Sequence, residues 1–263
     1  SVSEYVINGF NLARQTRNNS YGFVMLLFQR MISSSTKAIL DAMEARANRL
    51  SIQRNEINRE NLINNNDIIE YFEGNGQDIE NGLFDFIATT HAKYDTELAI
   101  LQSLIKDAKD CYEDETDVKV TYLLKKLEEI KKESQNPDIK VLIFTEFTST
   151  QEMLKEKLEI KGGYKCESIN GSMDFDRRIQ ALKNFKNNSQ ILISTDAAGE
   201  SLNMQFCNIV FNYDMPWNPM VLEQRIGRVD RIGQLSDVHA YNLMLENSIE
   251  RRVYEVIETK LDA

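Results

Sequence analysis

The second half of the chain alternates short apolar runs with longer amphipathic segments. The apolar runs predict strands at residues 140–145, 166–169, 190–194, 208–212 and 238–243. The segments between and after them predict helices at 150–160, 175–186, 220–231 and 248–261. Such alternation is typical of βαβ units, whose crossovers are right-handed and cover both faces of a parallel sheet. We therefore expect an α/β fold with a doubly wound parallel sheet.

The first half of the chain has a different character. Its apolar residues recur at helical spacing, as in Phe23, Leu26, Leu27 and Met31. A polar, Asn-rich stretch at about 51–90 interrupts this pattern and is expected to be an insertion. The boundary lies near Pro137. We therefore expect a mostly helical region over 1–135, followed by the α/β domain over 136–263.

Composition limits the possible functions. The formal net charge of −10 has the wrong sign for nucleic-acid binding by overall charge, so such binding would need a local basic patch. The three cysteines are far apart and the two histidines have no partners nearby in sequence, so we expect no metal site and a cytoplasmic protein with reduced thiols. The first residues do not resemble a signal peptide, and the longest apolar run is too short to cross a membrane.

One segment, residues 224–234, carries arginines at a regular spacing of three. Arg225, Arg228 and Arg231 would lie on one face of a helix, where three like charges repel. Such a face is often merely solvated, but Gly227 and Gly233 argue against that interpretation, because a solvated helix has no need of glycine. Arginine binds phosphate oxygens in a bidentate manner. The segment therefore predicts contact with an anionic group.

This segment resembles motif VI of the superfamily 2 helicases and translocases, in particular the Swi/Snf-type branch and bacterial members such as the RNA-polymerase-recycling ATPases. Residues 194–205 resemble motif V, and residues 141–147 resemble motif IV. Residues 169–173, with Arg178 and Phe185, resemble the segment between them. Four motif matches in the right order are stronger support for the resemblance than any one match alone. The resemblance implies that 136–263 form a second RecA-like lobe and that 1–135 follow the first lobe.

The resemblance also implies roles for individual residues. Arg228 and Arg231 match the arginine fingers that act on the γ-phosphate of ATP, and would be the catalytic residues. The positions expected on the nucleotide side are Gly199, Glu200, Asn203, Gln224 and Arg225. The positions expected to meet the DNA backbone are Thr145, Gly171, Ser172, Thr195 and Asp196. Ser201 stands where the family usually has Gly.

The chain contains no phosphate loop of the form G-x-x-x-x-G-K-[ST] and no acidic Walker B tetrad. ATP and Mg²⁺ would therefore be bound mainly by a first lobe outside this sequence. We expect the chain to be the C-terminal half of a bacterial DNA-dependent ATP hydrolase of the Swi/Snf type, and to be inactive by itself.

The expected partners are the double-stranded DNA backbone, the first lobe and a nucleoprotein target, with no membrane. Two alternatives stay open. One is an unwinding superfamily 2 helicase from a restriction or phage-defence system, and the other is a non-catalytic RecA-like docking module. The sequence does not reveal the remodelled target, the pathway, whether strands are unwound, the structure of residues 51–90 or the oligomeric state.

Overall fold

The computed structural model describes residues 1–55, 94–113, 117–136, 138–196, 204–230, 233–234, 236–246 and 251. The chain divides into two compact units, Ser1–Thr116 and Asp117–Ala263. The division lies before the helix at 118–134, whereas the sequence assigned that helix to the helical region. The helix predicted at 248–261 lies, apart from residue 251, outside the described residues.

The first unit is helical in its described part. Its helices are α1 (Val2–Thr16), α2 (Asn19–Ser34), α3 (Thr36–Asn55) and α6 (Tyr94–Glu113). Capping explains where they begin. Ser1 and Glu4 form a capping box at α1, the Asn18 side chain accepts from Tyr21 N at 3.0 Å at α2, and the Ser35 hydroxyl accepts from Ala38 N at 3.0 Å at α3.

A buried ion pair ties this helical unit together. Arg46 of α3 donates from Nε to Glu97 Oε1 of α6 at 2.6 Å, and the Tyr5 hydroxyl of α1 donates to the same oxygen at 2.6 Å. Burial, together with the charge of Glu97, raises the pKa of Tyr5 far above its usual range. The three side chains thus link helices that are distant in the sequence, and Tyr5 stays protonated as a donor.

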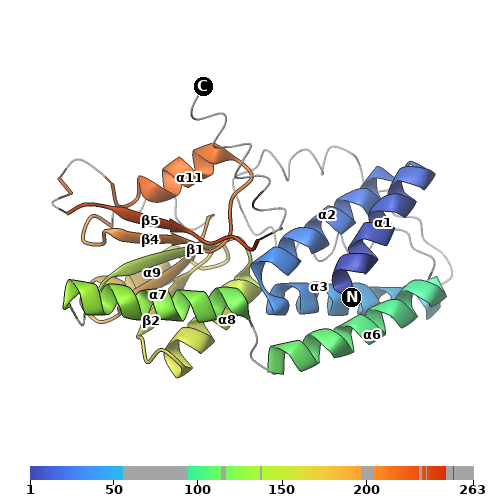
Figure 1. Cartoon of the computed structure of the whole chain (residues 1–263), viewed down its shortest axis with the longest axis horizontal. Coiled ribbons are helices and arrows are strands. Elements are labelled where there is room, and N and C mark those ends of the chain that lie inside the picture. Colours follow the sequence, from blue (N-terminus) through green and yellow to red (C-terminus); the bar gives the residue numbers. More distant parts are fainter. Residues whose placement is uncertain are drawn as a thin grey trace. The chain divides into compact units, whose positions relative to one another are not determined.

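The second unit is an α/β domain with a five-stranded parallel sheet, which confirms the fold class (Figure 1). Its strands are β1 (Val141–Thr145), β2 (Cys166–Ile169), β3 (Ile191–Thr195), β4 (Ile209–Asn212) and β5 (His239–Asn242), in the order β2-β3-β1-β4-β5. Its helices are α7 (Val118–Ser134), α8 (Thr148–Ile160), α9 (Phe175–Asn187) and α11 (Pro219–Ile226).

The central strands are buried on both faces, as continuous apolar runs predict. On one face Leu142, Leu192 and Val210 pack with Ala181 and Phe185 of α9. In Figure 1, α7 and α8 lie on one side of the sheet and α11 on the other. This sandwich makes the sheet a rigid base for residues at the ends of its strands.

The register places the carboxyl ends of three strands side by side. Thr145 of β1 pairs with Thr195 of β3, and Phe144 pairs with Asn212 of β4. Ligands of open parallel sheets bind beyond these ends. The residues that follow β1, β3 and β4 are therefore the first place to look for a functional site.

Candidate functional site

A buried arginine occupies the carboxyl edge of the sheet. Arg225 of α11 donates from Nε and Nη2 to the two carboxylate oxygens of Asp196, at 2.6 and 2.8 Å. Its Nη1 donates to Asn212 Oδ1 at 3.2 Å and to the Asp214 carbonyl at 2.7 Å, and the guanidinium lies 5.3 Å from the centroid of the Phe144 ring. Only 2% of the Arg225 side chain is exposed. Arg225 therefore joins the residue after β3 to the residues that end β4.

The charge of Arg225 is maintained by its partners. Burial alone would lower the pKa of the guanidinium, but the charge and hydrogen bonds of Asp196 outweigh that effect and raise the pKa. The Asp196 side chain keeps 26% of its surface exposed. The pair is thus a charged, bidentate contact with one side open to water.

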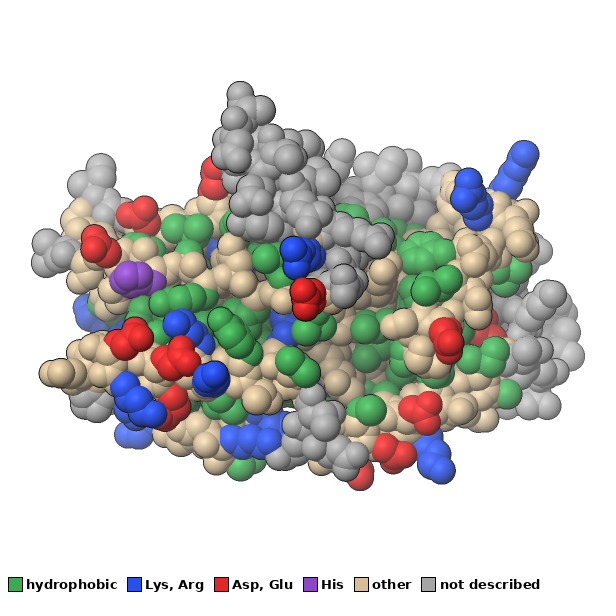
Figure 2. Space-filling view, in the orientation of Figure 1, with side chains coloured by type: hydrophobic (Ala, Val, Ile, Leu, Met, Phe, Trp, Pro, Cys, Tyr) green, Lys and Arg blue, Asp and Glu red, His purple; other side chains and the backbone are tan. Residues whose placement is uncertain are grey.

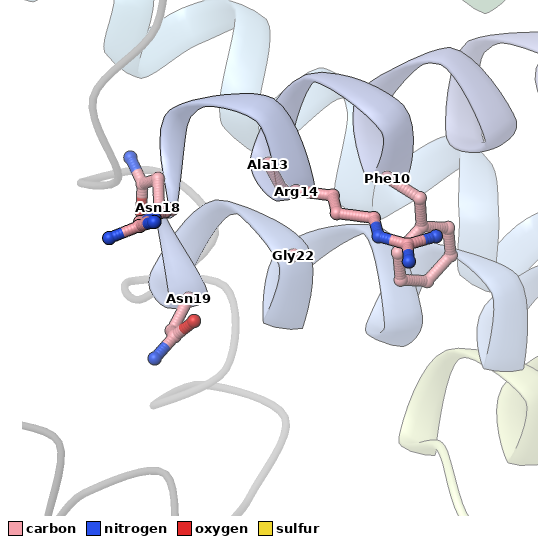
Figure 3. A pocket seen from close by; sticks show the side chains of 7 residues that line it. Phe10, Ala13, Arg14, Asn18, Asn19 and Gly22 are labelled. Carbon is pink, nitrogen blue, oxygen red and sulfur yellow. The ribbon is translucent and has the colours of Figure 1, made fainter.

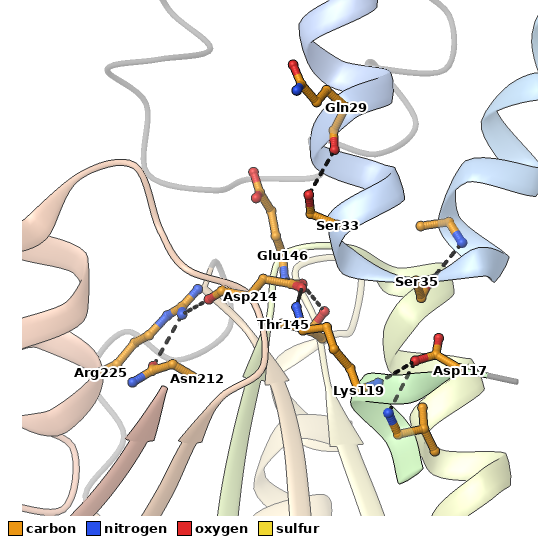
Figure 4. Close-up of polar contacts among 12 residues, drawn as sticks. Gln29, Ser33, Ser35, Asp117, Lys119, Thr145, Glu146, Asn212, Asp214 and Arg225 are labelled. Carbon is orange, nitrogen blue, oxygen red and sulfur yellow. Dashed lines mark hydrogen bonds and ion pairs between the residues drawn. The ribbon is translucent and has the colours of Figure 1, made fainter. Parts of the chain in front are cut away.

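Asp214 is the second organising residue of this edge (Figure 4). Its Oδ2 accepts from the Thr145 hydroxyl at 2.6 Å and from the Glu146 backbone N–H at 2.9 Å. The Lys119 ammonium lies 3.5 Å from its Oδ1 and 4.7 Å from the centroid of the Tyr213 ring. Asp214 therefore connects the start of α7, the end of β1 and the segment after β4.

These contacts show where the structure places three of the residues expected at the DNA backbone. Thr145 is fully buried and its hydroxyl donates to Asp214. Thr195 is buried at the end of β3, and its carbonyl accepts from the Ser194 hydroxyl at 2.9 Å. Asp196 faces Arg225. In this arrangement the side chains of Thr145 and Asp196 hold the edge of the sheet together from within, through Asp214 and Arg225.

The turn after β2 contains the other two, Gly171 and Ser172. The Gly171 carbonyl accepts from Arg178 Nη2 at 2.6 Å, and the exposed Ser172 hydroxyl donates to Asn170 Oδ1 at 2.8 Å. Asn170 in turn donates to the buried Gln151 side chain at 3.0 Å. The turn is thus braced from behind while Ser172 lies at the surface.

Gln151 is a residue that the sequence did not reveal as an organiser. Its Nε2 donates to the Ile169 carbonyl at 2.9 Å and to the Ile193 carbonyl at 2.8 Å, so it bridges β2 and β3. No motif marks it, because its partners are far away along the chain. It lies among other polar residues at the start of α8, between Thr150 and Glu152, so its composition does not mark it either.

The helix that carries the arginine segment is shorter than predicted. It was expected to run to residue 231, but α11 ends at Ile226, where the Gly227 N–H donates to the Glu223 carbonyl at 2.8 Å. The expectation that all three arginines share one helical face is therefore wrong for Arg225 and Arg228. Arg225 points into the protein, and the half-buried Arg228 lies in the turn after the helix.

The backbone of Arg228 is held on both sides. Its N–H donates to the Arg225 carbonyl at 3.2 Å, and its carbonyl accepts from Met204 N at 3.1 Å.

Gln224 is exposed on α11. Four of the predicted site residues lie outside the described part of the chain: Gly199, Glu200, Asn203 and Arg231.

The described residues contain no group of His, Cys, Asp and Glu side chains that could hold a metal ion. Among the same residues, no helix is long and apolar enough to cross a membrane. On the face drawn in Figure 2, acidic and basic side chains are interspersed around α7. The described edge combines the buried guanidinium of Arg225 with the partly exposed carboxylate of Asp196, and the half-buried Arg228 follows in the turn after α11.

A RecA-like lobe whose sheet edge carries an arginine-rich segment is the class of domain found in helicases. The family model described as "Helicase conserved C-terminal domain" matches residues 119–233. The crystal structure of the C-terminal part of the Fun30 ATPase domain resembles the chain with a TM-score of 0.51 and 25% identity, covering 71% of this chain and 60% of that one.

Sequence relatives agree with this assignment. The uncharacterized ATP-dependent helicase YqhH of Bacillus subtilis is 41% identical over 124 residues, which are 47% of this chain and 22% of that protein. The RNA polymerase-associated protein RapA of Vibrio atlanticus is 34% identical, over 46% of this chain and 12% of that protein. The ATP-dependent DNA helicase DDM1 of Arabidopsis thaliana is 36% identical, over 46% and 16%.

Residues 119–233 are thus a superfamily 2 helicase C-terminal domain, and the relatives of the chain are Snf2-type ATPases. The aligned part of the chain spans less than a quarter of the length of these sequence relatives.

Proposed function

We propose that this chain is the C-terminal lobe of a Snf2-type, double-stranded-DNA-dependent ATPase translocase. In this proposal Arg228 and Arg231 are arginine fingers that act on ATP bound mainly by a first lobe of the same protein. The observation that carries the proposal is the Asp196–Arg225 pair. It anchors the motif VI-like segment to the end of β3, from which the motif V-like segment begins.

The local geometry suits a finger at Arg228. Arg225 is locked three residues earlier, and the Arg228 backbone is bonded to Arg225 and to Met204. A guanidinium positioned in advance stabilises the charge that spreads over the γ-phosphate oxygens as the phosphoryl group transfers, without reorganisation during the reaction. The proposed role of Arg225 is to position this segment from inside the protein.

The proposed nucleotide side of the lobe also includes Gln224 and the segment with Gly199, Glu200 and Asn203. The exposed amide of Gln224 and the guanidinium of Arg228 fit a phosphate tail, whereas the described residues hold no acidic cluster for Mg²⁺. When bound, ATP with Mg²⁺ supplies the phosphoryl group and its leaving group. This chain contributes donors to the γ-phosphate.

The proposed DNA contact is sequence-independent. Ser172 presents an exposed hydroxyl at a braced turn, and hydroxyl groups contact phosphate oxygens without reading bases. Thr145, Thr195 and Asp196 would act on DNA through the shape of the edge that they hold. The remodelled target would be a nucleoprotein complex that meets the whole enzyme.

The test is the rate of ATP hydrolysis, with duplex DNA, by the intact protein that contains this chain. Arg228→Ala should lower kcat by about 10³-fold or more and change KM little, because a finger acts on charge that develops in the transition state. Arg231→Ala should behave in the same way. Arg228→Lys should rescue poorly, since an ammonium lacks the planar fork of a guanidinium.

The matched control is Arg49→Ala, which removes an exposed arginine from α3 and should leave both constants unchanged. Equal losses in kcat and in nucleotide affinity for Arg228→Ala would make this arginine a ground-state ligand. Unchanged turnover would remove the proposal and leave a docking module as the better description.

A further inference from the structure

A hollow of about 600 Å³ lies at the turn between α1 and α2, away from the sheet edge in sequence and entirely within the helical unit. It is lined by Phe10, Ala13, Arg14, Arg17, Asn18, Asn19 and Gly22. Figure 3 shows Arg14 and Phe10 extending from α1, with Asn18 and Asn19 at the turn. No carboxylate is among the lining residues, all of which the structure describes.

The polar groups of the hollow are donors. Arg14 and Arg17 are exposed and carry permanent charge. The Asn18 side-chain oxygen accepts from Tyr21 N at 3.0 Å, which leaves its amide nitrogen as the atom available to a ligand. The positive end of the α2 dipole begins here as well. Two guanidinium groups, two amides and a helix dipole of this sign all favour an anion.

The surrounding charge agrees with this chemistry. Residues 1–55 contain seven basic and three acidic side chains, a formal charge of +4, within a chain whose net charge is −10. The basic excess is therefore local, and the hollow lies within it. The whole unit, residues 1–116, has a formal charge of −7, so a polyanion would be attracted by the local basic residues and not by the unit as a whole.

We propose that the hollow binds the phosphodiester backbone of nucleic acid, with Arg14 and Arg17 on phosphate oxygens and Asn18 and Asn19 as additional donors. The contact would be independent of sequence, as backbone contacts are. The inference deepens the proposed DNA-dependent function by adding a second contact, far along the chain from Ser172. Gly22 contributes no side chain to the lining of the hollow, and a Cβ there would lie 3.4 Å from Ala13 Cβ.

The experiment measures binding of the 263-residue chain to a fluorescent DNA duplex by anisotropy, across a salt series. The double variant Arg14→Gln, Arg17→Gln should weaken binding by about threefold to tenfold at low salt, the range expected for two exposed charge contacts. The slope of log K against log salt should fall by about two, because two phosphates are no longer neutralised. Gln suits position 17, since Gln135 adopts a similar φ of 51°.

Asn19→Asp separates binding from folding. Asn19 is the first residue of α2, where a carboxylate stabilises the helix through its dipole, so this variant should melt no lower than the wild-type chain. It should nevertheless weaken DNA binding, since it places a negative charge in the hollow. The matched controls are Asn48→Asp and Arg49→Gln on α3, both exposed, which should bind DNA within twofold of the wild-type chain.

Three results would overturn the inference: no DNA binding by the wild-type chain, unchanged binding by the double variant, or unchanged binding by Asn19→Asp. Displacement of the duplex by inorganic phosphate at constant ionic strength would instead assign the hollow to a free phosphate. A failure of this inference can be distinguished from a failure of the proposed function. Loss of turnover in Arg228→Ala with unchanged binding by the double variant rejects the hollow alone, and the converse rejects the finger alone.

Discussion

Replacing Arg225 with Met tests whether the arginine holds the sheet edge together. Met fills much of the same volume and has no charge, so the change removes the pair with Asp196 and the donors to Asn212 and Asp214 while keeping the packing. Removing one partner of a buried ion pair typically costs about 3–5 kcal/mol, since the other charge stays buried and unpaired. Because 26% of the Asp196 side chain is exposed, water can solvate it, and we expect the lower end, about 3 kcal/mol.

The assay is urea unfolding of the chain followed by tryptophan fluorescence. Trp217, the only tryptophan, is half-buried between β4 and α11, so it reports on the α/β unit. With an m value of about 2 kcal/mol/M, a loss of about 3 kcal/mol lowers the midpoint by about 1.5 M. The control is Arg177→Met, whose ion pair with Asp174 is exposed and should contribute less than about 1 kcal/mol.

A double-mutant cycle with Asp196→Asn assigns the effect to the pair. The sum of the stability losses in the two single variants should exceed the stability loss in the double variant by about 1–3 kcal/mol, as expected for residues in direct contact. A midpoint for Arg225→Met that matches the Arg177→Met midpoint would refute the reasoning. Additive losses in the cycle would show that Arg225 acts through its other contacts.

Three further predictions concern stability. Gly9→Ala should lower the melting temperature, because the new Cβ would overlap the fully buried Met25 side chain, and overpacking typically costs about 1–3 kcal/mol. Gly22→Ala should raise the melting temperature, because Ala favours the helix more than Gly and its Cβ would meet only Ala13, at 3.4 Å. Burial raises the pKa of Cys207 from 9.0 to about 12. The folded state therefore keeps the thiol protonated where the unfolded state loses the proton, so the stability that Cys207 contributes is complete below pH 9 and is lost as pH rises toward 12. Cys207→Ala should therefore remove about 1.4 kcal/mol per pH unit from the alkaline slope of stability, measured by urea midpoints.

The parallel sheet was predictable because its central strands are buried on both faces. Such strands must be continuous apolar runs, so β1 and β4 are visible in the sequence within one residue of their observed ends. Helices between them follow from the need for crossovers. The end of α11 was not predictable from periodicity, because Gly227 has an ordinary φ of −62°, and the helix ends where the Arg228 and Val229 N–H groups bond to carbonyls three residues back.

The burial of Arg225 could be inferred from its apolar neighbours in the sequence, although the spacing of the arginines alone does not indicate it. Leu222 and Val229 are buried at helical distance on either side of it, so Arg225 lies on the apolar stripe of its segment. An arginine on such a stripe must find a buried partner. The identity of that partner, Asp196, could not be deduced, since it is set by the register of β3 and lies 29 residues away.

The Asp196–Arg225 pair couples the segment after β3 to the segment that carries Arg228. Asp196 directly follows β3, inside the motif V-like segment, and Arg225 is three residues before Arg228. Because Arg225 is also bonded to Asn212 and to the Asp214 carbonyl, the pair fixes both segments to β4. With a coupling of about 1–3 kcal/mol for the pair, separation of the two segments is populated at about 20% or less. Within this lobe, a ligand that displaces Asp196 must therefore either move the backbone that carries Arg228 or break the pair.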